Sequence, residues 1–164
     1  MNFNKLLTIS IVLMVLSISL CAVSASSGNI DLGEITTSDF QITDVTSKGS
    51  MPSPVSSGPV TPSKLYDVDF TAHFEIDTSK MSDADKKLLT EAVNDGNTSF
   101  IINLTSDHKI SVELYKGADF SLEGDTLKID SSTYYTSIDG SRDVKVDTVG
   151  LRTRDNQLFV AEMD

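Results

Sequence analysis

Polar and apolar residues alternate along much of the chain with a period of two. In residues 66–77, every second residue from Tyr66 to Ile76 is apolar and every residue between them is polar. Such alternation predicts a β-strand with one buried and one solvated face, which is typical of antiparallel sheets. Shorter alternating stretches follow it. The body of the chain, 66–164, is therefore predicted to be a β-rich domain.

One segment, about 83–94, follows a helical period instead. Ser82 stands three residues before Asp85, the spacing of a helix N-cap, and Gly96 lies where a left-handed residue would end the helix. The apolar stripe is narrow and contains only two large residues. We expect a short helix that lies over one end or edge of the sheet.

A two-residue turn at 124–125 (Gly-Asp) predicts a hairpin. Counting outward from this turn pairs Leu122 with Leu127 and Phe120 with Ile129. Both pairs then lie on one face, so the turn and the apolar pattern predict the same register.

A second hairpin is predicted around Gly140. A three-residue loop that ends at this glycine would pair Val144 with Tyr134 on the apolar side. The apolar positions then change parity between Val146 and Val149. Such a change indicates a β-bulge or a corner.

The last hairpin is predicted to turn at 155–156 and to pair Leu151 with Val160. In all, the body should contain about eight or nine short strands and one inserted helix. We expect an antiparallel β-sandwich of the Ig-like or Greek-key type. The alternative is a small antiparallel β-barrel with the helix over one end, but strands of about 5–8 residues are short for a barrel with a ligand cavity.

Two segments precede this domain. Residues 26–45 are too short for a domain of their own, but Phe40 and Ile42 alternate with polar residues, which favours a strand over a tail. Residues 46–63 contain all four prolines and are rich in Ser and Thr. This composition is typical of a linker or a long loop.

Residues 1–25 have the layout of a secretory signal peptide: Lys5, an apolar run over 6–20, and small residues up to Ala25. We expect cleavage after Ala25 and a secreted or cell-surface protein. Two alternatives stay open. The run could be retained as an N-terminal anchor, or Cys21, the only cysteine, could carry a lipid.

The chain is acidic, with 24 Asp and Glu against 13 Lys and Arg and a net charge of −11. This charge argues against binding to nucleic acids, and against direct binding of the mature domain to anionic membranes. The single cysteine rules out an intramolecular disulfide and a cysteine-based zinc site. Motifs for a nucleophile elbow, a phosphate-binding loop and a dinucleotide-binding turn are absent from the sequence. The sequence therefore favours a non-catalytic protein over an enzyme.

The polar face of the strand at 66–77 holds the candidate metal ligands Asp69, His73 and Glu75. Residues two apart on one strand face are about 6.6 Å apart, so such side chains can share a divalent cation. A solvated face whose carboxylates pair with lysines of neighbouring strands, such as Lys128, explains the same pattern. We favour this second interpretation, and no cofactor is predicted.

N-glycosylation sequons occur at Asn97 and Asn103. Asn97 lies in the predicted turn between helix and strand, so it is the accessible candidate for glycosylation. Asn103 falls in the middle of a predicted strand.

This layout predicts an exported, non-catalytic β-sandwich module. Its expected partner is an extracellular protein or an envelope polymer, which it binds or helps to organise. Two other functions fit the sequence less well. One is a small barrel that binds an apolar ligand. The other is a secreted hydrolase that uses His73 or a pair of carboxylates.

Overall fold

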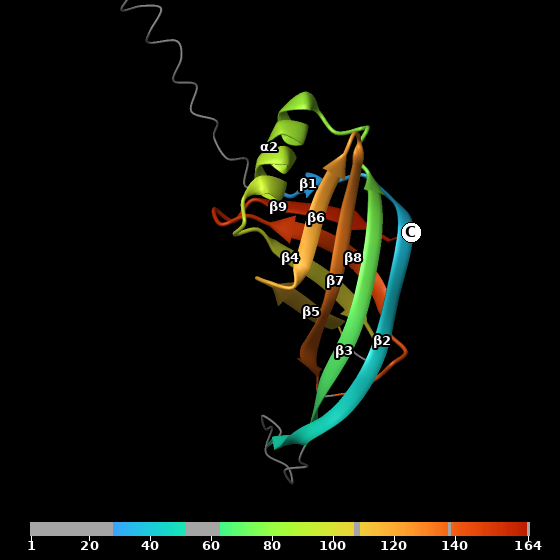
Figure 1. Cartoon of the computed structure of the whole chain (residues 1–164). Coiled ribbons are helices and arrows are strands. Elements are labelled where there is room, and N and C mark those ends of the chain that lie inside the picture. The colour runs from blue at the N-terminus through green and yellow to red at the C-terminus, as the bar shows by residue number, and fades with distance from the viewer. Residues whose placement is uncertain (1–27, 52–62, 107–108, 138, 164) are drawn as a thin grey trace, which may run out of the picture.

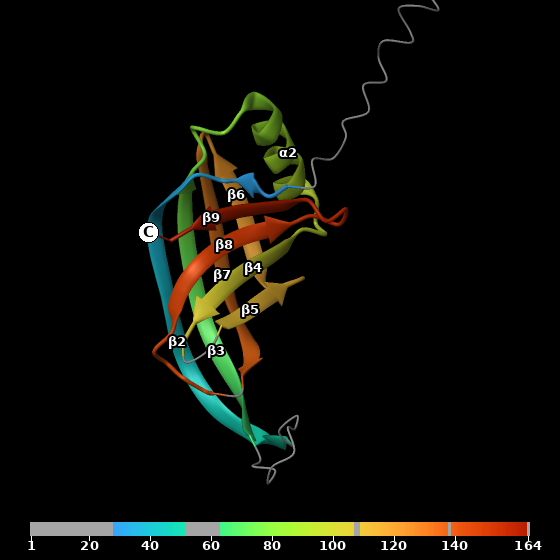
Figure 2. The ribbon, with the colours of Figure 1, turned by 180° about the vertical axis from the view of Figure 1, so that it is seen from behind.

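The computed structural model describes residues 28–51, 63–106, 109–137 and 139–163. These residues form nine strands and one helix, arranged as two separate sheets (Figure 1). The predicted β-sandwich with one short helix is confirmed. The expected strand length of about 5–8 residues is wrong for three strands, Glu34–Met51, Ser63–Asp77 and Thr126–Ser137, which are 18, 15 and 12 residues long. The barrel alternative is wrong, because the sheets do not close on each other. The strands of one sheet run across those of the other in both ribbon views (Figures 1 and 2).

The four-stranded sheet is antiparallel throughout. Its order is β2 (Glu34–Met51), β3 (Ser63–Asp77), β7 (Thr126–Ser137) and β6 (Ala118–Glu123). The five-stranded sheet has the order β1 (Ile30–Asp31), β9 (Leu158–Glu162), β8 (Lys145–Arg152), β4 (Ser99–Thr105) and β5 (Lys109–Leu114). Here β1 runs parallel to β9, and the other neighbours are antiparallel.

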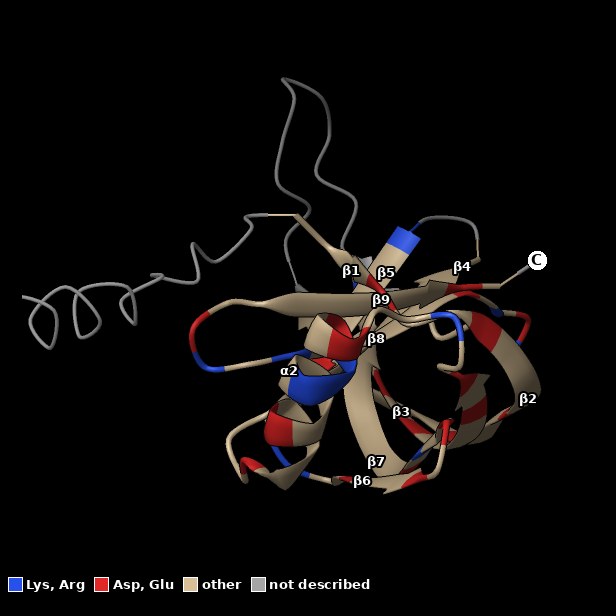
Figure 3. Cartoon of the chain, turned by 90° about the horizontal axis from the view of Figure 1, so that it is seen from above, with Lys and Arg blue, Asp and Glu red and all other residues tan. Residues whose placement is uncertain are grey.

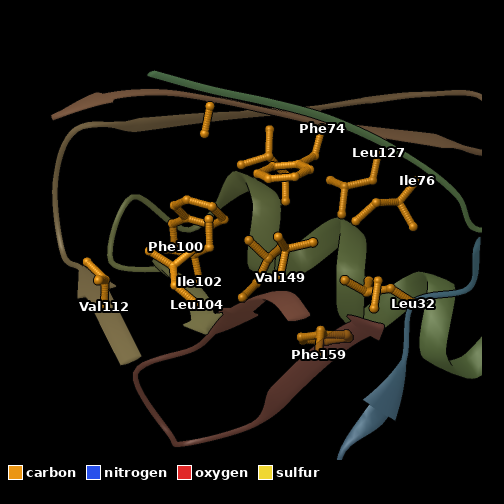
Figure 4. Packing of buried hydrophobic residues seen from close by; sticks show 14 of the residues in the cluster. Leu32, Phe74, Ile76, Phe100, Ile102, Leu104, Val112, Leu127, Val149 and Phe159 are labelled. Carbon is orange, nitrogen blue, oxygen red and sulfur yellow. The ribbon is translucent and has the colours of Figure 1, made fainter. Parts of the chain in front are cut away.

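The core lies between the inner faces of the two sheets. The alternation of β3 buries Val68, Phe70, Ala72, Phe74 and Ile76, as predicted. Side chains of the two sheets point toward one another in the close view (Figure 4). Among them, the ring centroids of Phe74 and Phe100 are 6.3 Å apart. Each large apolar side chain buried in this way contributes about 1.5–3 kcal/mol to stability.

Helix α2 spans Asp83–Asn94, as the helical period predicts. The hydroxyl of Ser82 accepts a hydrogen bond from the backbone N–H of Asp85 at 3.2 Å and caps the N-terminus. The predicted left-handed stop at Gly96 is wrong, since this glycine is not among the residues with positive φ. The helix ends instead at Asp95, whose backbone N–H donates to the carbonyl of Glu91.

The hairpin at 124–125 has the predicted register, in which Leu122 pairs with Leu127 and Phe120 with Ile129. The bulge between Val146 and Val149 is also confirmed, because β8 inserts one extra residue, at 147, opposite β4.

The hairpin predicted around Gly140 is wrong. This glycine has the expected left-handed φ of 60°, but the connection leads from β7 in one sheet to β8 in the other. The loop packs closely against Tyr66 of β3. A Cβ on Gly140 would lie 2.7 Å from the ring of this tyrosine, so no larger residue fits there. Val144 lies in this connection, just before β8, and does not pair with Tyr134 of β7.

The last hairpin exists, but its register differs by one residue. Leu151 pairs with Phe159 instead of Val160. The loop is longer than predicted, since the backbone N–H of Thr153 donates to the carbonyl of Gln157 at 3.0 Å. As a result, Phe159 and Ala161 face the core.

The strand predicted around Phe40 and Ile42 is part of β2, which pairs along β3. It extends through residues 46–51, which the composition assigned to a linker. The partner strand supplies backbone hydrogen bonds there, and Ser and Thr fit a strand well when such a partner exists. Residues 52–62 of the predicted linker lie outside the described residues, as do the signal segment 1–25 and Cys21.

Within the described ranges, no helix combines the length and the apolar character needed to cross a membrane.

Candidate functional site

The outer face of the four-stranded sheet gathers carboxylates from all four strands. Alternation sends the polar residues of β3 to this side, and the neighbouring strands place acidic residues in the same cross-strand rows. We call this surface the acidic face. Its carboxylates are those of Asp39, Asp44, Asp67, Asp69, Glu75, Asp119, Glu123 and Asp130.

His73 lies in one of these rows, between Asp39 of β2 and Asp130 of β7. Its Nδ1 is 2.7 Å from Oδ1 of Asp130, and its Nε2 is 3.9 Å from Oε1 of Glu75. The row crosses a shallow groove of about 500 Å³, which Asp119 also lines. The imidazole therefore sits among carboxylates, and its side chain is 37% exposed.

The three candidate metal ligands do not form one site. Asp69 is four residues from His73 along β3, a separation of about 13 Å in a strand, and it lies opposite Tyr134 of β7. Glu75 faces Lys128, whose Nζ is 3.8 Å from its Oε1. Among the described residues, no three His, Cys, Asp or Glu side chains are grouped so that they could hold a metal ion.

Lysines neutralise part of the acidic face. The Nζ of Lys128 is 2.8 Å from Oε2 of Glu123, and this hydrogen bond raises the pKa of Lys128, with help from the charges of Glu75 and Asp130. Lys48 pairs with Asp67 at 3.2 Å. The predicted pairing of carboxylates with lysines across strands is thus found for these members.

Other members of the face have no such partner. In the part of the chain that the structure describes, no ion pair reaches Asp39, Asp69 or Asp119, and all three are exposed. The carboxylate of Asp39 accepts a hydrogen bond from the side-chain amide of Gln41 at 2.9 Å. The face therefore keeps an excess of negative charge.

The groove does not assemble a hydrolytic triad in the described residues. Both ring nitrogens of His73 face carboxylates, and the hydroxyl of the nearby Ser131 donates to the carbonyl of Gly117 at 2.8 Å. No serine or threonine hydroxyl of the described residues contacts the imidazole. The second histidine, His108, lies outside the described residues.

An aromatic side chain stands on the same face. Tyr134 is 60% exposed and lies opposite Asp69. The predicted hairpin, which pairs Tyr134 with Val144, puts the tyrosine on the apolar side, and this is wrong. The parity of β7 runs unbroken from Leu127 and turns Tyr135 inward instead, and this continuity was the signal that could have placed Tyr134 correctly.

Comparisons with protein-family models, with curated protein sequences and with solved structures find no match for this chain. An acidic face with one exposed aromatic ring can attract cations and contact an extended ligand. Among the described residues, it positions no nucleophile beside a base.

The two sequons differ in accessibility. Asn97 is exposed in the turn between α2 and β4, where its side-chain amide donates to Oδ1 of Asp95 at 3.0 Å. Asn103 is half-buried in β4 and donates to the hydroxyl of Thr148 at 2.6 Å. A glycan is easier to accommodate at Asn97.

Proposed function

We propose that the protein is an exported, non-catalytic β-sandwich module that binds a cationic extracellular protein or an amine-bearing envelope polymer through its acidic face. The observation that carries this proposal is that no cation of the described residues pairs with Asp39, Asp69 or Asp119, which lie on three different strands. Neighbouring like charges repel, so such a face destabilises the free protein slightly. A cationic partner removes this repulsion and is attracted over a distance by the summed negative potential.

The spacing of the face supports an extended partner. Neighbouring strands are about 4.8 Å apart, and successive outward residues of one strand are about 6.6 Å apart. Carboxylates on such a grid can pair with several amines of one chain at once. Tyr134 adds an exposed ring, whose face can hold a lysine, an arginine or another ammonium group through a cation–π contact.

The location in this proposal rests on the signal-like N-terminal segment. A module that lacks cysteine after cleavage does not depend on the redox state outside the cell, which suits this location. The core between the two sheets is large enough for a stable domain without disulfides.

The test is binding of the purified, labelled exported protein to the surface of the cells that produce it, and to their isolated envelopes. The Asp69→Lys/Asp119→Lys double variant should lose about tenfold or more in affinity, because repulsion replaces two attractive contacts. The matched control is Glu91→Lys/Asp155→Lys, which makes the same change in net charge at exposed positions in helix α2 and in the loop between β8 and β9. Neither element supplies a carboxylate of the acidic face.

Saturable binding that survives in the control but not in the acidic-face variant supports the proposal. Digestion of the envelope with a protease or with glycosidases then separates a protein partner from a polymer. The proposal fails if wild-type protein shows no saturable binding, or if both double variants lose the same affinity.

A further inference from the structure

A second surface lies at the end of the molecule that carries helix α2. A cleft of about 1050 Å³ opens there between β1, the start of β2, the connection from β3 to α2 and the C-terminal end of β9. We call it the end cleft. Figure 3 looks down on this end of the molecule.

The floor of the end cleft is apolar. Five half-buried side chains line it: Ile30, Ile35, Met81, Val160 and Met163. They come from four separate segments of the chain. Accessible apolar side chains with polar residues around them are typical of binding sites on soluble proteins. Two of the five are methionines, whose flexible side chains adapt to apolar partners of different shape.

The rim of the same cleft is acidic. Asp31, Glu34, Asp85 and Glu162 line it, against one cation, Lys80. The Nζ of Lys80 is 3.8 Å from Oε2 of Glu34, and both side chains are largely exposed, so this pair is weak. The carboxylate of Asp85 accepts a hydrogen bond from the hydroxyl of Ser82 at the start of α2. Asp31 accepts a hydrogen bond from the backbone N–H of Gly33 at 2.9 Å. Among the described residues, no side-chain hydrogen bond or ion pair reaches Glu162, so its charge is available to a ligand.

We propose that the end cleft docks a polypeptide segment in which apolar residues alternate with lysine or arginine. The apolar side chains would cover the floor, and the cations between them would pair with the rim. Charge complementarity selects a cationic segment, and the apolar floor distinguishes it from a partner attracted by charge alone.

The position of β1 favours an extended segment. This strand is the edge of the five-stranded sheet among the described strands, and it forms one wall of the cleft. An extended peptide can therefore add backbone hydrogen bonds to those of its side chains, as in other cases of strand addition. The surface is distinct from the acidic face, so either proposal can fail without the other.

The probe is a fluorescently labelled octapeptide that alternates leucine and lysine, measured by anisotropy with the exported protein. We expect saturable binding. The Glu34→Lys/Glu162→Lys double variant should weaken it about tenfold or more. Met81→Ser, which removes part of the floor, should weaken it about threefold or more.

Two controls separate this cleft from general electrostatics. The Asp69→Lys/Asp119→Lys variant has the same net charge as the cleft variant and should change the affinity less than about twofold. The acidic face can itself attract a cationic chain, so the second control is measured on the Asp69→Lys/Asp119→Lys variant. An octapeptide of alternating serine and lysine should bind this variant at least about tenfold more weakly than the leucine–lysine peptide does, because it cannot cover the apolar side chains of the cleft. If the cleft variant does not fold, Glu34→Gln/Glu162→Gln replaces it, with a loss of about threefold expected.

The proposal is overturned if the leucine–lysine peptide shows no saturable binding at millimolar concentration. It is also overturned if the acidic-face variant loses as much affinity for this peptide as the cleft variant, or if the acidic-face variant binds the serine–lysine peptide as tightly as the leucine–lysine peptide.

Discussion

The hydroxyl of Tyr135 offers a sharp test of the core. The side chain is only 7% exposed and its ring packs against Phe70, with the centroids 5.8 Å apart. Its buried hydroxyl has no hydrogen-bond partner among the described residues. An unsatisfied buried polar group costs about 1–3 kcal/mol, so Tyr135→Phe, which keeps the ring, should stabilise the protein by about 1 kcal/mol.

This gain corresponds to a rise of about 3 °C in Tm for a domain of this size. Urea and thermal unfolding of the exported protein at neutral pH measure it. The matched control is Tyr134→Phe, because the neighbouring ring is 60% exposed on the opposite face. That variant should stay within about 0.5 kcal/mol of the wild type.

The pH dependence gives a second readout of the same group. Burial, and then the charge of Asp139, raise the pKa of the Tyr135 phenol above its ordinary value of 10.0. Below about pH 10 the phenol is neutral in both states, and the free energy of unfolding does not depend on its titration. As the pH rises from there through the folded pKa, the free energy of unfolding falls, because the unfolded chain releases the proton first. Wild-type protein should lose stability more steeply than Tyr135→Phe at alkaline pH.

A loss of more than about 0.5 kcal/mol in Tyr135→Phe at neutral pH would refute this reasoning, since the hydroxyl would then be making a favourable hydrogen bond. Equal stabilisation by Tyr134→Phe would refute it too.

Three further predictions concern the fold and the predicted metal ligands. Gly150→Ala should lower the free energy of unfolding in urea by about 2 kcal/mol or more, because its Cβ would clash with the carbonyl oxygen of Phe159. Gly49→Ala, which has nothing within 4 Å of its Cβ, should lower it far less. Ser82→Ala should cost about 1 kcal/mol through loss of the N-cap, and the exposed Ser121→Ala close to none. Calcium, zinc and manganese should produce no saturable rise in Tm, and His73→Ala should have little effect on stability. A rise in Tm of several degrees at micromolar metal, abolished by His73→Ala, would contradict this.

Local features were predictable because local physics determines them. The alternation over 66–77 is read directly as a buried and a solvated face, and the structure shows that pattern in β3. The helix at 83–94 follows from its own cap and period. The hairpin at 124–125 follows from a two-residue turn, which leaves only one register for its strands.

The candidate surfaces were predictable only in part. The outward row of β3 could be identified, and with it Asp69, His73 and Glu75. Their neighbours in the rows, such as Asp39 and Asp119, come from strands whose pairing the sequence does not specify. The end cleft was missed altogether, because its lining residues are scattered along the chain and do not form a motif.

By itself, then, the sequence determined the class of the protein: a β-rich sandwich with one capped helix, an acidic surface and a signal-like N-terminal segment. Only the tertiary structure decided that β7 and β8 belong to different sheets, that β9 buries Phe159 and that Tyr134 faces outward. The physical reason is that the alternation of a strand specifies two faces but no partner. Which face is buried, and beside which neighbour, depends on contacts between residues far apart in the chain.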